Sequence, residues 1–215
     1  MVCIYLYMID TGSTGSKHIF VQLSANGLHA EALRLATQTT YPSFGYWLSQ
    51  GATSCWEDWS GVTDASHVNQ PTHNHIFLCG GLGEWMYKSI SGITPIEPGF
   101  SRVRIAPTID ETIGPAGVNT SLDTPYGLVL VSYTRSLSPN TIKLVVRTPK
   151  TAVVVVPLLG RNVSDVTIKE GGIEVWVPPG KYVPKVRGIK DAKVTPDGKS
   201  VKLIIDPGSY SFETI

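Results

Sequence analysis

The chain has 215 residues, 42% of them hydrophobic, and its charge nearly cancels, with 18 Lys and Arg against 17 Asp and Glu. This composition can fill one or two hydrophobic cores, so we expect a globular protein. No basic run could follow a phosphate backbone, and no apolar stretch reaches the roughly 20 residues that span a bilayer, which argues against nucleic acid and membranes as partners.

The first part of the chain, up to about residue 93, has apolar residues at helical spacing. One stripe covers residues 28–36 and starts directly after the breaker pair Asn26-Gly27. A second stripe covers residues 82–93 and closes with Gly and Pro, the expected order at a helix end. We predict helices at these two places and shorter ones at residues 17–24 and 44–50.

The second part, from about residue 101, alternates between apolar and polar residues, as strands do. A hairpin is predicted over Lys193–Leu203, because the Pro and Gly of Thr195–Gly198 suit a tight turn. The other predicted strands are residues 102–105, 127–133, 142–147, 151–156 and 173–177.

Helices followed by strands, without alternation, predict an α+β chain with two segregated parts. We place the boundary after residue 97, so that residues 1–97 are helical and residues 98–215 form an antiparallel β-sandwich. The few short helices of the first part would leave apolar surface uncovered, which is a first indication that the chain is truncated.

Two features bear on the compartment. The three cysteines, Cys3, Cys55 and Cys79, are too few and too irregularly spaced for a disulfide framework or a paired-thiolate zinc site, which favours a reducing environment. Residues 1–8 are briefly apolar but have neither a basic leader nor a small-residue cleavage site. We therefore expect no signal peptide there, and a cytoplasmic location is favoured.

The segment Trp56–Trp59 carries the strongest chemical signal, because two indoles flank the carboxylates of Glu57 and Asp58. Such a loop offers apolar faces for sugar stacking together with an acid or base, and glycoside hydrolysis needs two carboxyl groups across the scissile bond. Beside Trp56 and Trp59, Glu57 would be partly desolvated and a more effective proton acceptor. On residue chemistry alone, however, a solvated turn carboxylate remains the favoured interpretation of Glu57.

Several neighbouring residues have competing interpretations. His73 and His75 could share a metal with Glu57, His67 or Cys79, but no spacing signature fixes the other ligands, so we expect neither a metal nor a cofactor. Residues 80–83 are glycine-rich and are interpreted as a tight turn rather than a phosphate cradle.

Glu84 is expected to open a helix, and Trp85 and Met86 are expected in its core stripe. Trp47, Trp56 and Trp59 fit a buried aromatic core and a sugar-binding wall equally well.

Ordered motifs occur along nearly the whole chain, at Thr39–Trp47, Gly51–Thr53, Trp56–Trp59, Asn74-His75, Gly81–Tyr87 with Ser91–Ile93, and Asp123–Gly127. Together they resemble glycoside hydrolase family 78, the bacterial and fungal α-L-rhamnosidases. Asp123–Gly127 resembles that family's C-terminal sandwich, and the motifs before it resemble the late catalytic barrel.

The resemblance implies that residues 1–97 are the remnant of an (α/α)6 barrel, followed by an antiparallel β-sandwich. It also implies inverting hydrolysis of terminal α-L-rhamnosides, with Glu57 as the general base and His75 as a sugar contact. The three tryptophans Trp47, Trp56 and Trp59 would line the substrate site.

The family's general acid lies in an upstream motif that this sequence lacks. We therefore expect a C-terminal fragment that is inactive alone, with a rhamnose-containing glycoside as ligand and the missing upstream part of the barrel as a partner. The alternative is a non-catalytic carbohydrate-binding or structural module built on the β-sandwich.

Overall fold

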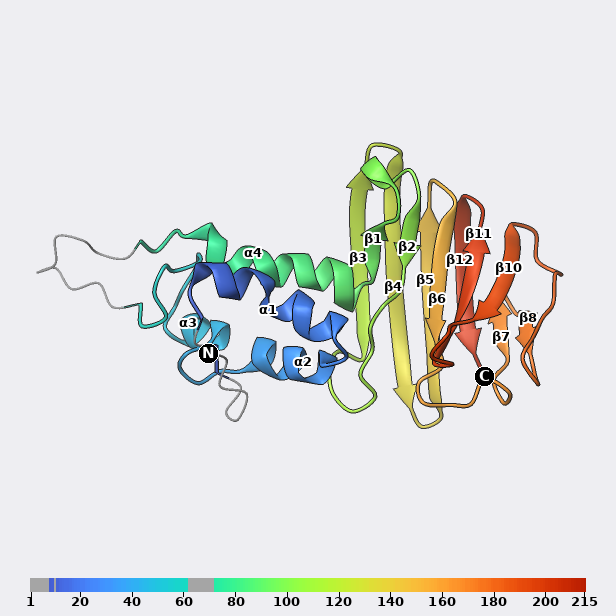
Figure 1. Ribbon diagram of the computed structural model, residues 1–215, viewed down its shortest axis with the longest axis horizontal. Helices are drawn as coiled ribbons and strands as arrows, with labels where there is room; N and C mark the ends of the chain where they lie inside the picture. The colour runs from blue at the N-terminus through green and yellow to red at the C-terminus, as the bar shows by residue number, and fades with distance from the viewer. Residues whose placement is uncertain (1–7, 10, 62–71) are drawn as a thin grey trace, which may run out of the picture. The chain divides into compact units, whose positions relative to one another are not determined.

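The computed structural model of the chain describes residues 8–9, 11–61 and 72–215. They form two compact units, Met1–Met86 and Tyr87–Ile215, of which the first is helical and the second consists mostly of strands (Figure 1). The units divide after Met86, whereas the predicted domain boundary falls after residue 97. A compact unit need not coincide with a domain, so that boundary stays a prediction. In the part of the chain that the structure describes, no helix is long and apolar enough to cross a membrane.

The helices of the first unit confirm three of the predicted elements. They are α1 (Ser13–Ala25), α2 (His29–Thr37), α3 (Phe44–Ser49) and α4 (Ile76–Trp85), and α4 continues in sequence into a π-helical turn, η2 (Met86–Ile90). Helix α1 ends where Gly27 takes the left-handed conformation, with φ at +81°. Helix α3 begins where the Ser43 hydroxyl accepts a hydrogen bond from the Tyr46 N–H at 3.0 Å.

Helix α4 differs from the prediction, because it begins at Ile76, and residues 80–83 lie inside it. The interpretation of this glycine run as a tight turn is therefore wrong. A side chain at Gly81 would overlap the main chain of Lys17 in α1, so the glycine permits the two helices to pack closely. The prediction that Glu84 opens the helix is also wrong, since Glu84 lies near its end.

The apolar stripe of α4 is only partly as predicted. Trp85 is buried, with 2% of its surface exposed, but Met86 is 48% exposed and does not belong to the core. The wider π-helical turn begins at Met86, so the 3.6-residue period no longer keeps following residues on the same face. Ile93 lies beyond the helix, in a strand.

The core of the helical unit is aromatic. The ring of Phe20 lies 5.4 Å from the ring of Trp85 and 6.0 Å from that of Phe44. The Trp85 indole N–H donates to the Ser24 hydroxyl at 2.7 Å, and this hydroxyl is also 2.8 Å from the His29 Nδ1. The core thus satisfies its buried polar groups while the rings fill the space between α1, α2 and α4.

The second unit is a β-sandwich. Its five-stranded sheet has the order β1 (Ile93–Pro95), β2 (Val103–Ile105), β6 (Ala152–Pro157), β11 (Ser200–Ile205), β10 (Ile189–Val194). Its seven-stranded sheet has the order β3 (Gly117–Thr124), β4 (Gly127–Leu137), β5 (Asn140–Thr148), β12 (Gly208–Thr214), β7 (Ile168–Glu170), β8 (Ile173–Val177), β9 (Lys181–Tyr182). Neighbouring strands are antiparallel except β2 and β6, which are parallel.

All the strands predicted from the sequence are present, and the predicted hairpin is confirmed. Strands β10 and β11 pair antiparallel with Val194 opposite Val201, and Gly198 takes the left-handed position of the turn, with φ at +70°. The prediction missed β1, β3, β7, β9 and β12. Strand β3 lacks a clear signal because five of its eight residues are Asn, Thr, Ser or Asp.

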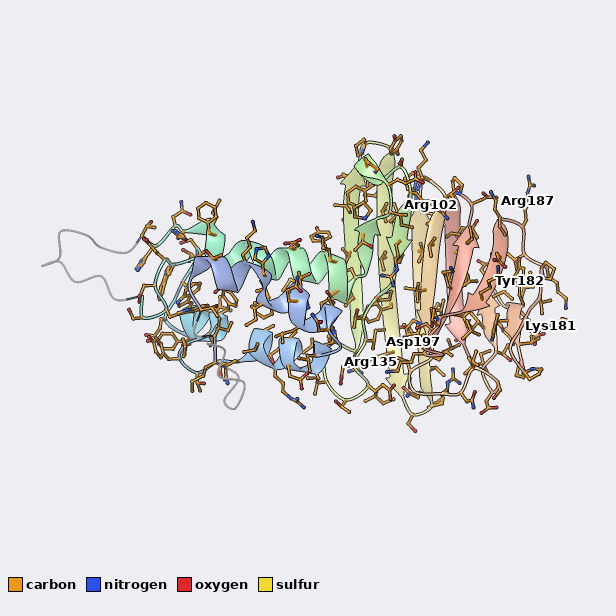
Figure 2. The ribbon with its side chains drawn as sticks, viewed as in Figure 1. Arg102, Arg135, Lys181, Tyr182, Arg187 and Asp197 are labelled. Atoms are coloured by element: carbon orange, nitrogen blue, oxygen red, sulfur yellow. A yellow bond between two sulfur atoms is a disulfide. The ribbon has the colours of Figure 1, made fainter. Side chains whose placement is uncertain are left out.

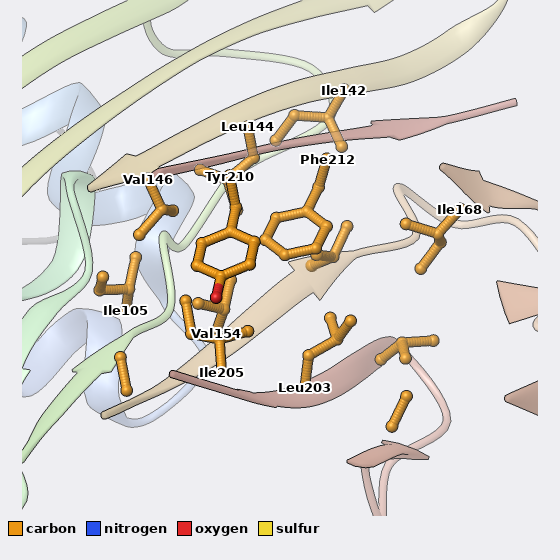
Figure 3. Close-up of a cluster of buried hydrophobic side chains, with 14 of the residues drawn as sticks. Ile105, Ile142, Leu144, Val146, Val154, Ile168, Leu203, Ile205, Tyr210 and Phe212 are labelled. Atoms are coloured by element: carbon orange, nitrogen blue, oxygen red, sulfur yellow. The ribbon is translucent and has the colours of Figure 1, made fainter. Parts of the chain in front are cut away.

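The two sheets enclose one apolar core (Figure 3). Phe212 is completely buried and stacks on Tyr210, with ring centroids 6.0 Å apart and planes at 3°. Leu144 from the strand next to β12 and Leu203 from the other sheet are also completely buried. Each such side chain contributes about 1.5–3 kcal/mol by leaving water, which is why the alternating pattern folds as a sandwich.

Candidate active-site loop

Two segments of the helical unit, residues 54–57 and 72–75, are joined by main-chain hydrogen bonds. The Glu57 N–H donates to the Thr72 carbonyl at 2.9 Å, and the His75 N–H donates to the Cys55 carbonyl at 2.7 Å. The Ser54 hydroxyl donates to the His73 carbonyl. The predicted base and the predicted sugar-contacting histidine therefore lie on two segments that are hydrogen-bonded to each other, although they are 18 positions apart in the sequence.

Glu57 is exposed, and its carboxylate is oriented by the main chain. Its Oε2 accepts a hydrogen bond from the Thr72 N–H at 2.8 Å. The prediction that flanking indoles desolvate Glu57 is wrong for this chain, because Trp56 and Trp59 pack against other groups. A carboxylate held by one main-chain amide keeps lone pairs that can accept a proton from a bound water.

The Trp56 indole is buried between two neighbours. Its ring stacks on the His73 ring, with centroids 4.6 Å apart. Gly61 lies so close to the indole that any side chain at this position would overlap it. Gly61 also has φ at +63°, which favours glycine. The His73 Nε2 lies 3.2 Å from the Gly61 carbonyl, which ties the three residues together.

Trp47 and Trp59 stack on each other, with ring centroids 4.5 Å apart. The Trp47 indole N–H donates to the Trp59 carbonyl at 3.0 Å, and the Trp59 indole N–H donates to the Thr11 carbonyl at 3.3 Å. Trp47 is 2% exposed, whereas Trp59 is half-buried. Of the three tryptophans, Trp47 and Trp56 form the packed support of the loop, and Trp59 keeps the most accessible face.

His75 immediately precedes α4 and is half-buried. Its ring contacts that of Phe77 edge-on, with centroids 5.3 Å apart, and its Nδ1 is buried without a hydrogen-bond partner among the described atoms. Buried ring nitrogens are usually paired, so this orphaned nitrogen is an exception within the described part of the chain. Phe77 is 62% exposed and extends the aromatic surface beside it.

A disulfide joins Cys55 to Cys79, with their Cα atoms 6.0 Å apart. The expectation that the cysteines form no disulfide is therefore wrong for this pair, and the argument for a reducing compartment loses its support. The pairing depends on the loop bringing residues 24 positions apart together, which no local pattern reveals. Cys3 lies outside the described residues.

A metal site formed by His73 and His75 receives no additional ligands from the described residues. In the described part of the chain, no three His, Cys, Asp or Glu side chains are grouped as metal ligands. Cys79 is bound in the disulfide and has no thiolate to offer, and His67 lies outside the described residues.

The charged residues of the sandwich are spread over the unit rather than gathered, as Figure 2 shows for Arg102, Arg135, Lys181, Arg187 and Asp197. Several have local structural roles. Arg135 donates to the carbonyls of Asp110 and Gly114, and the hydroxyl of Thr195, in the β10–β11 turn, lowers the pKa of Asp197 by a hydrogen bond.

The sequence predicts Glu57 and His75 as site residues but gives little signal for the groups that position them. Thr72 orients Glu57 through its main-chain N–H, which any residue type except proline could supply, so the sequence carries no signal for it. Gly61 follows the aromatic segment closely, and a glycine there was the only available hint of close packing on Trp56.

A helical unit with an aromatic loop that presents a carboxylate, followed in sequence by a β-sandwich, fits the class of glycosidases with a helical catalytic domain and an accessory sandwich. Comparison with known families agrees. The sequence model of the bacterial alpha-L-rhamnosidase 6 hairpin glycosidase domain matches residues 3–90, and that of the bacterial alpha-L-rhamnosidase C-terminal domain matches residues 92–172.

The chain belongs to the bacterial α-L-rhamnosidase family and corresponds to its C-terminal part, the end of the helical barrel and the β-sandwich. The predicted family and fold class are thereby confirmed.

Individual relatives lead to the same family. An alpha-L-rhamnosidase of Formosa agariphila is 28% identical over 207 residues, which are 95% of this chain and 21% of that protein. The structure of alpha-L-rhamnosidase from Dictyoglumus thermophilum superposes with a TM-score of 0.76 at 26% identity, over 97% of this chain and 21% of that one. The Streptomyces avermitilis enzyme, solved in complex with L-rhamnose, has the same fold, with a TM-score of 0.74 at 23% identity over 96% of this chain and 18% of that one. This chain spans about a fifth of the length of these relatives.

Proposed function

We propose that this chain supplies the water-activating side of an α-L-rhamnosidase active site, with Glu57 as the general base. The observation that carries the proposal is the orientation of the Glu57 carboxylate by the Thr72 N–H, within the segment that matches the glycosidase-domain model. The relatives are named alpha-L-rhamnosidase, and one was solved with L-rhamnose bound, which supports a rhamnose-containing substrate.

The proposed reaction inverts the anomeric centre. Glu57 removes a proton from a water molecule while the water oxygen attacks the anomeric carbon, and a carboxylic acid on the opposite side protonates the leaving oxygen. Inversion needs the two carboxyl groups about 6.5–9.5 Å apart, so that the water fits between them. We propose that the acid comes from the upstream part of the barrel, which would then be a partner of this chain.

The other predicted residues have supporting parts in this proposal. His75 would contact a sugar hydroxyl with the accessible part of its half-buried ring. Trp59, the more accessible indole, would face the deoxyhexose, while Trp47 and Trp56 hold the loop from behind. The apolar face of a 6-deoxy sugar suits such an aromatic surface.

A chimera tests the proposal. This chain would replace the matching C-terminal part of the Dictyoglumus thermophilum enzyme, to which it is structurally similar along 97% of its length. In an active chimera, Glu57→Gln should lower kcat by about 10²- to 10⁴-fold and leave KM nearly unchanged, because the amide cannot accept the proton from water.

Asp58→Asn is the matched control. Asp58 is the adjacent exposed carboxylate, and it accepts hydrogen bonds from the N–H and the hydroxyl of Ser60, at 2.7 Å for the N–H. This variant should retain kcat within a few fold, because the Asp58 carboxylate binds the neighbouring Ser60. Near-normal turnover by Glu57→Gln, or equal losses in the two variants, would contradict the assignment of the base.

A further inference from the structure

A disulfide connects the segment that carries Glu57, residues 54–57, to helix α4, which directly follows the segment that carries His75, residues 72–75. Cys55 lies two residues before Glu57, and Cys79 lies in the first turns of α4, four residues after His75. The cross-link therefore joins the first of the two hydrogen-bonded segments, residues 54–57, to the helix that directly follows the second, residues 72–75. Both cysteines are half-buried, so the sulfur atoms are not sealed inside the apolar core of the unit.

Without this cross-link, the two segments are joined, among the described residues, by non-covalent contacts at exposed or half-buried groups. Glu57, Thr72 and Asn74 are exposed, so water competes for the hydrogen bonds that Glu57 and Thr72 make with each other. One ring contact also joins the segments, the stack of Trp56 on His73, but His73 is only half-buried, so this contact is partly open to water. The bond between Glu57 and Thr72 joins residues 15 positions apart, so it must also overcome the entropy of closing the intervening chain.

We propose that Cys55 and Cys79 are positioning residues that keep Glu57 on the Thr72 amide and His75 on the Cys55 carbonyl. The geometry of the loop then depends on the oxidation state of this pair. The catalytic meaning of the proposal rests on the proposed function, whereas the structural effect does not.

The redox step requires a dithiol reductant. One thiolate of the dithiol attacks a sulfur of the Cys55–Cys79 bond and forms a mixed disulfide, and its second thiolate then displaces the protein sulfur. Two electrons and two protons pass to the protein, which gains two thiols, and the dithiol becomes a disulfide. The segments that carry Glu57 and His75 are then held by their hydrogen bonds and the Trp56–His73 stack, without a covalent cross-link.

Amide hydrogen exchange on the intact chain tests the proposal without any substrate. The amides of Glu57, Thr72 and His75 should exchange about tenfold faster or more after reduction with dithiothreitol, because they open locally. Amides in the middle of α1 and α2 should keep their rates. A Cys55→Ala/Cys79→Ala double variant should show the fast rates under oxidising conditions and no further response to dithiothreitol.

Cys3→Ala is the control, because it removes the remaining cysteine of the chain and leaves the cross-linked pair in place. It should respond to dithiothreitol as the unaltered chain does. Unchanged exchange at the three loop amides after reduction would overturn the proposal. Equal acceleration in α1 and α2 would also overturn it, since the disulfide would then stabilise the whole unit rather than position the loop.

The catalytic consequence is measured separately in the chimera, where reduction should lower kcat more than it raises KM. If Glu57→Gln leaves the chimera active, the proposed base is wrong, yet the exchange result still decides whether the disulfide positions the loop. The two failures are thus distinguishable. A loss of loop protection on reduction with unchanged kcat in a chimera that depends on Glu57 would refute the positioning role in catalysis.

Discussion

Gly81 offers a sharp test of how the helical unit is packed. It lies in α4 and is buried, and a side chain there would overlap the main chain of Lys17 in α1. Gly83 lies in the same helix, is exposed, and has open space where a Cβ would stand. Alanine at these two positions therefore brings the same gain in helix propensity but opposite packing consequences.

The expected magnitudes follow from these surroundings. Replacing glycine by alanine inside a helix stabilises it by roughly 0.5–1 kcal/mol, and Gly83→Ala should show this gain. In Gly81→Ala the same gain is opposed by overpacking, which costs about 1–3 kcal/mol. The obstructing atoms belong to the Lys17 backbone and cannot rotate away, so the upper half of that range applies. The two variants should differ by about 2–3 kcal/mol in free energy of unfolding.

Urea titration followed by tryptophan fluorescence can measure this difference. Four of the five tryptophans lie in the helical unit, and only Trp176 lies in the sandwich, so the signal reports mainly the unit that carries the change. Gly81→Ala should lower the urea midpoint and Gly83→Ala should raise it. Equal midpoints for the two variants would refute the close approach of α1 and α4 at Gly81.

Three further predictions concern other parts of the chain. Phe212→Ala should destabilise the sandwich by about 3–5 kcal/mol, measured by near-ultraviolet circular dichroism in urea, because its ring is completely buried; a loss below about 1 kcal/mol would contradict this. Burial raises the pKa of Tyr133 from 10.0 to about 12, so the folded state favours the neutral phenol. The contribution of Tyr133 to stability should be complete below pH 10 and lost as the pH rises towards 12. Phenolate absorbance measures this ionisation, and ionisation of Tyr133 near pH 10, as for an ordinary tyrosine, would contradict the prediction. Gly61→Ala should displace the Trp56 ring and change its fluorescence, and an unchanged emission spectrum would argue against the contact.

The sequence predicted the elements whose pattern is local. The apolar spacing of residues 28–36 led to α2, and the alternation in residues 142–147 led to β5, because each pattern repeats the period of the backbone that carries it. The β10–β11 turn was also predictable, because Pro196 fixes its own φ angle and Gly198 can take the left-handed conformation that the turn requires. Ordered motifs around Glu57 were enough to indicate the family.

Tertiary structure decided what depends on distant residues. The glycine run at residues 80–83 has low helix propensity, yet packing against Lys17 keeps it helical, so local propensity was overridden. The pairing of Cys55 with Cys79 and the hold of Thr72 on Glu57 both join segments far apart in the chain. The exposure of Glu57 likewise depends on where its neighbouring indoles pack. Such contacts form only when distant segments come together in the folded chain, so no period or motif within a short segment predicts them.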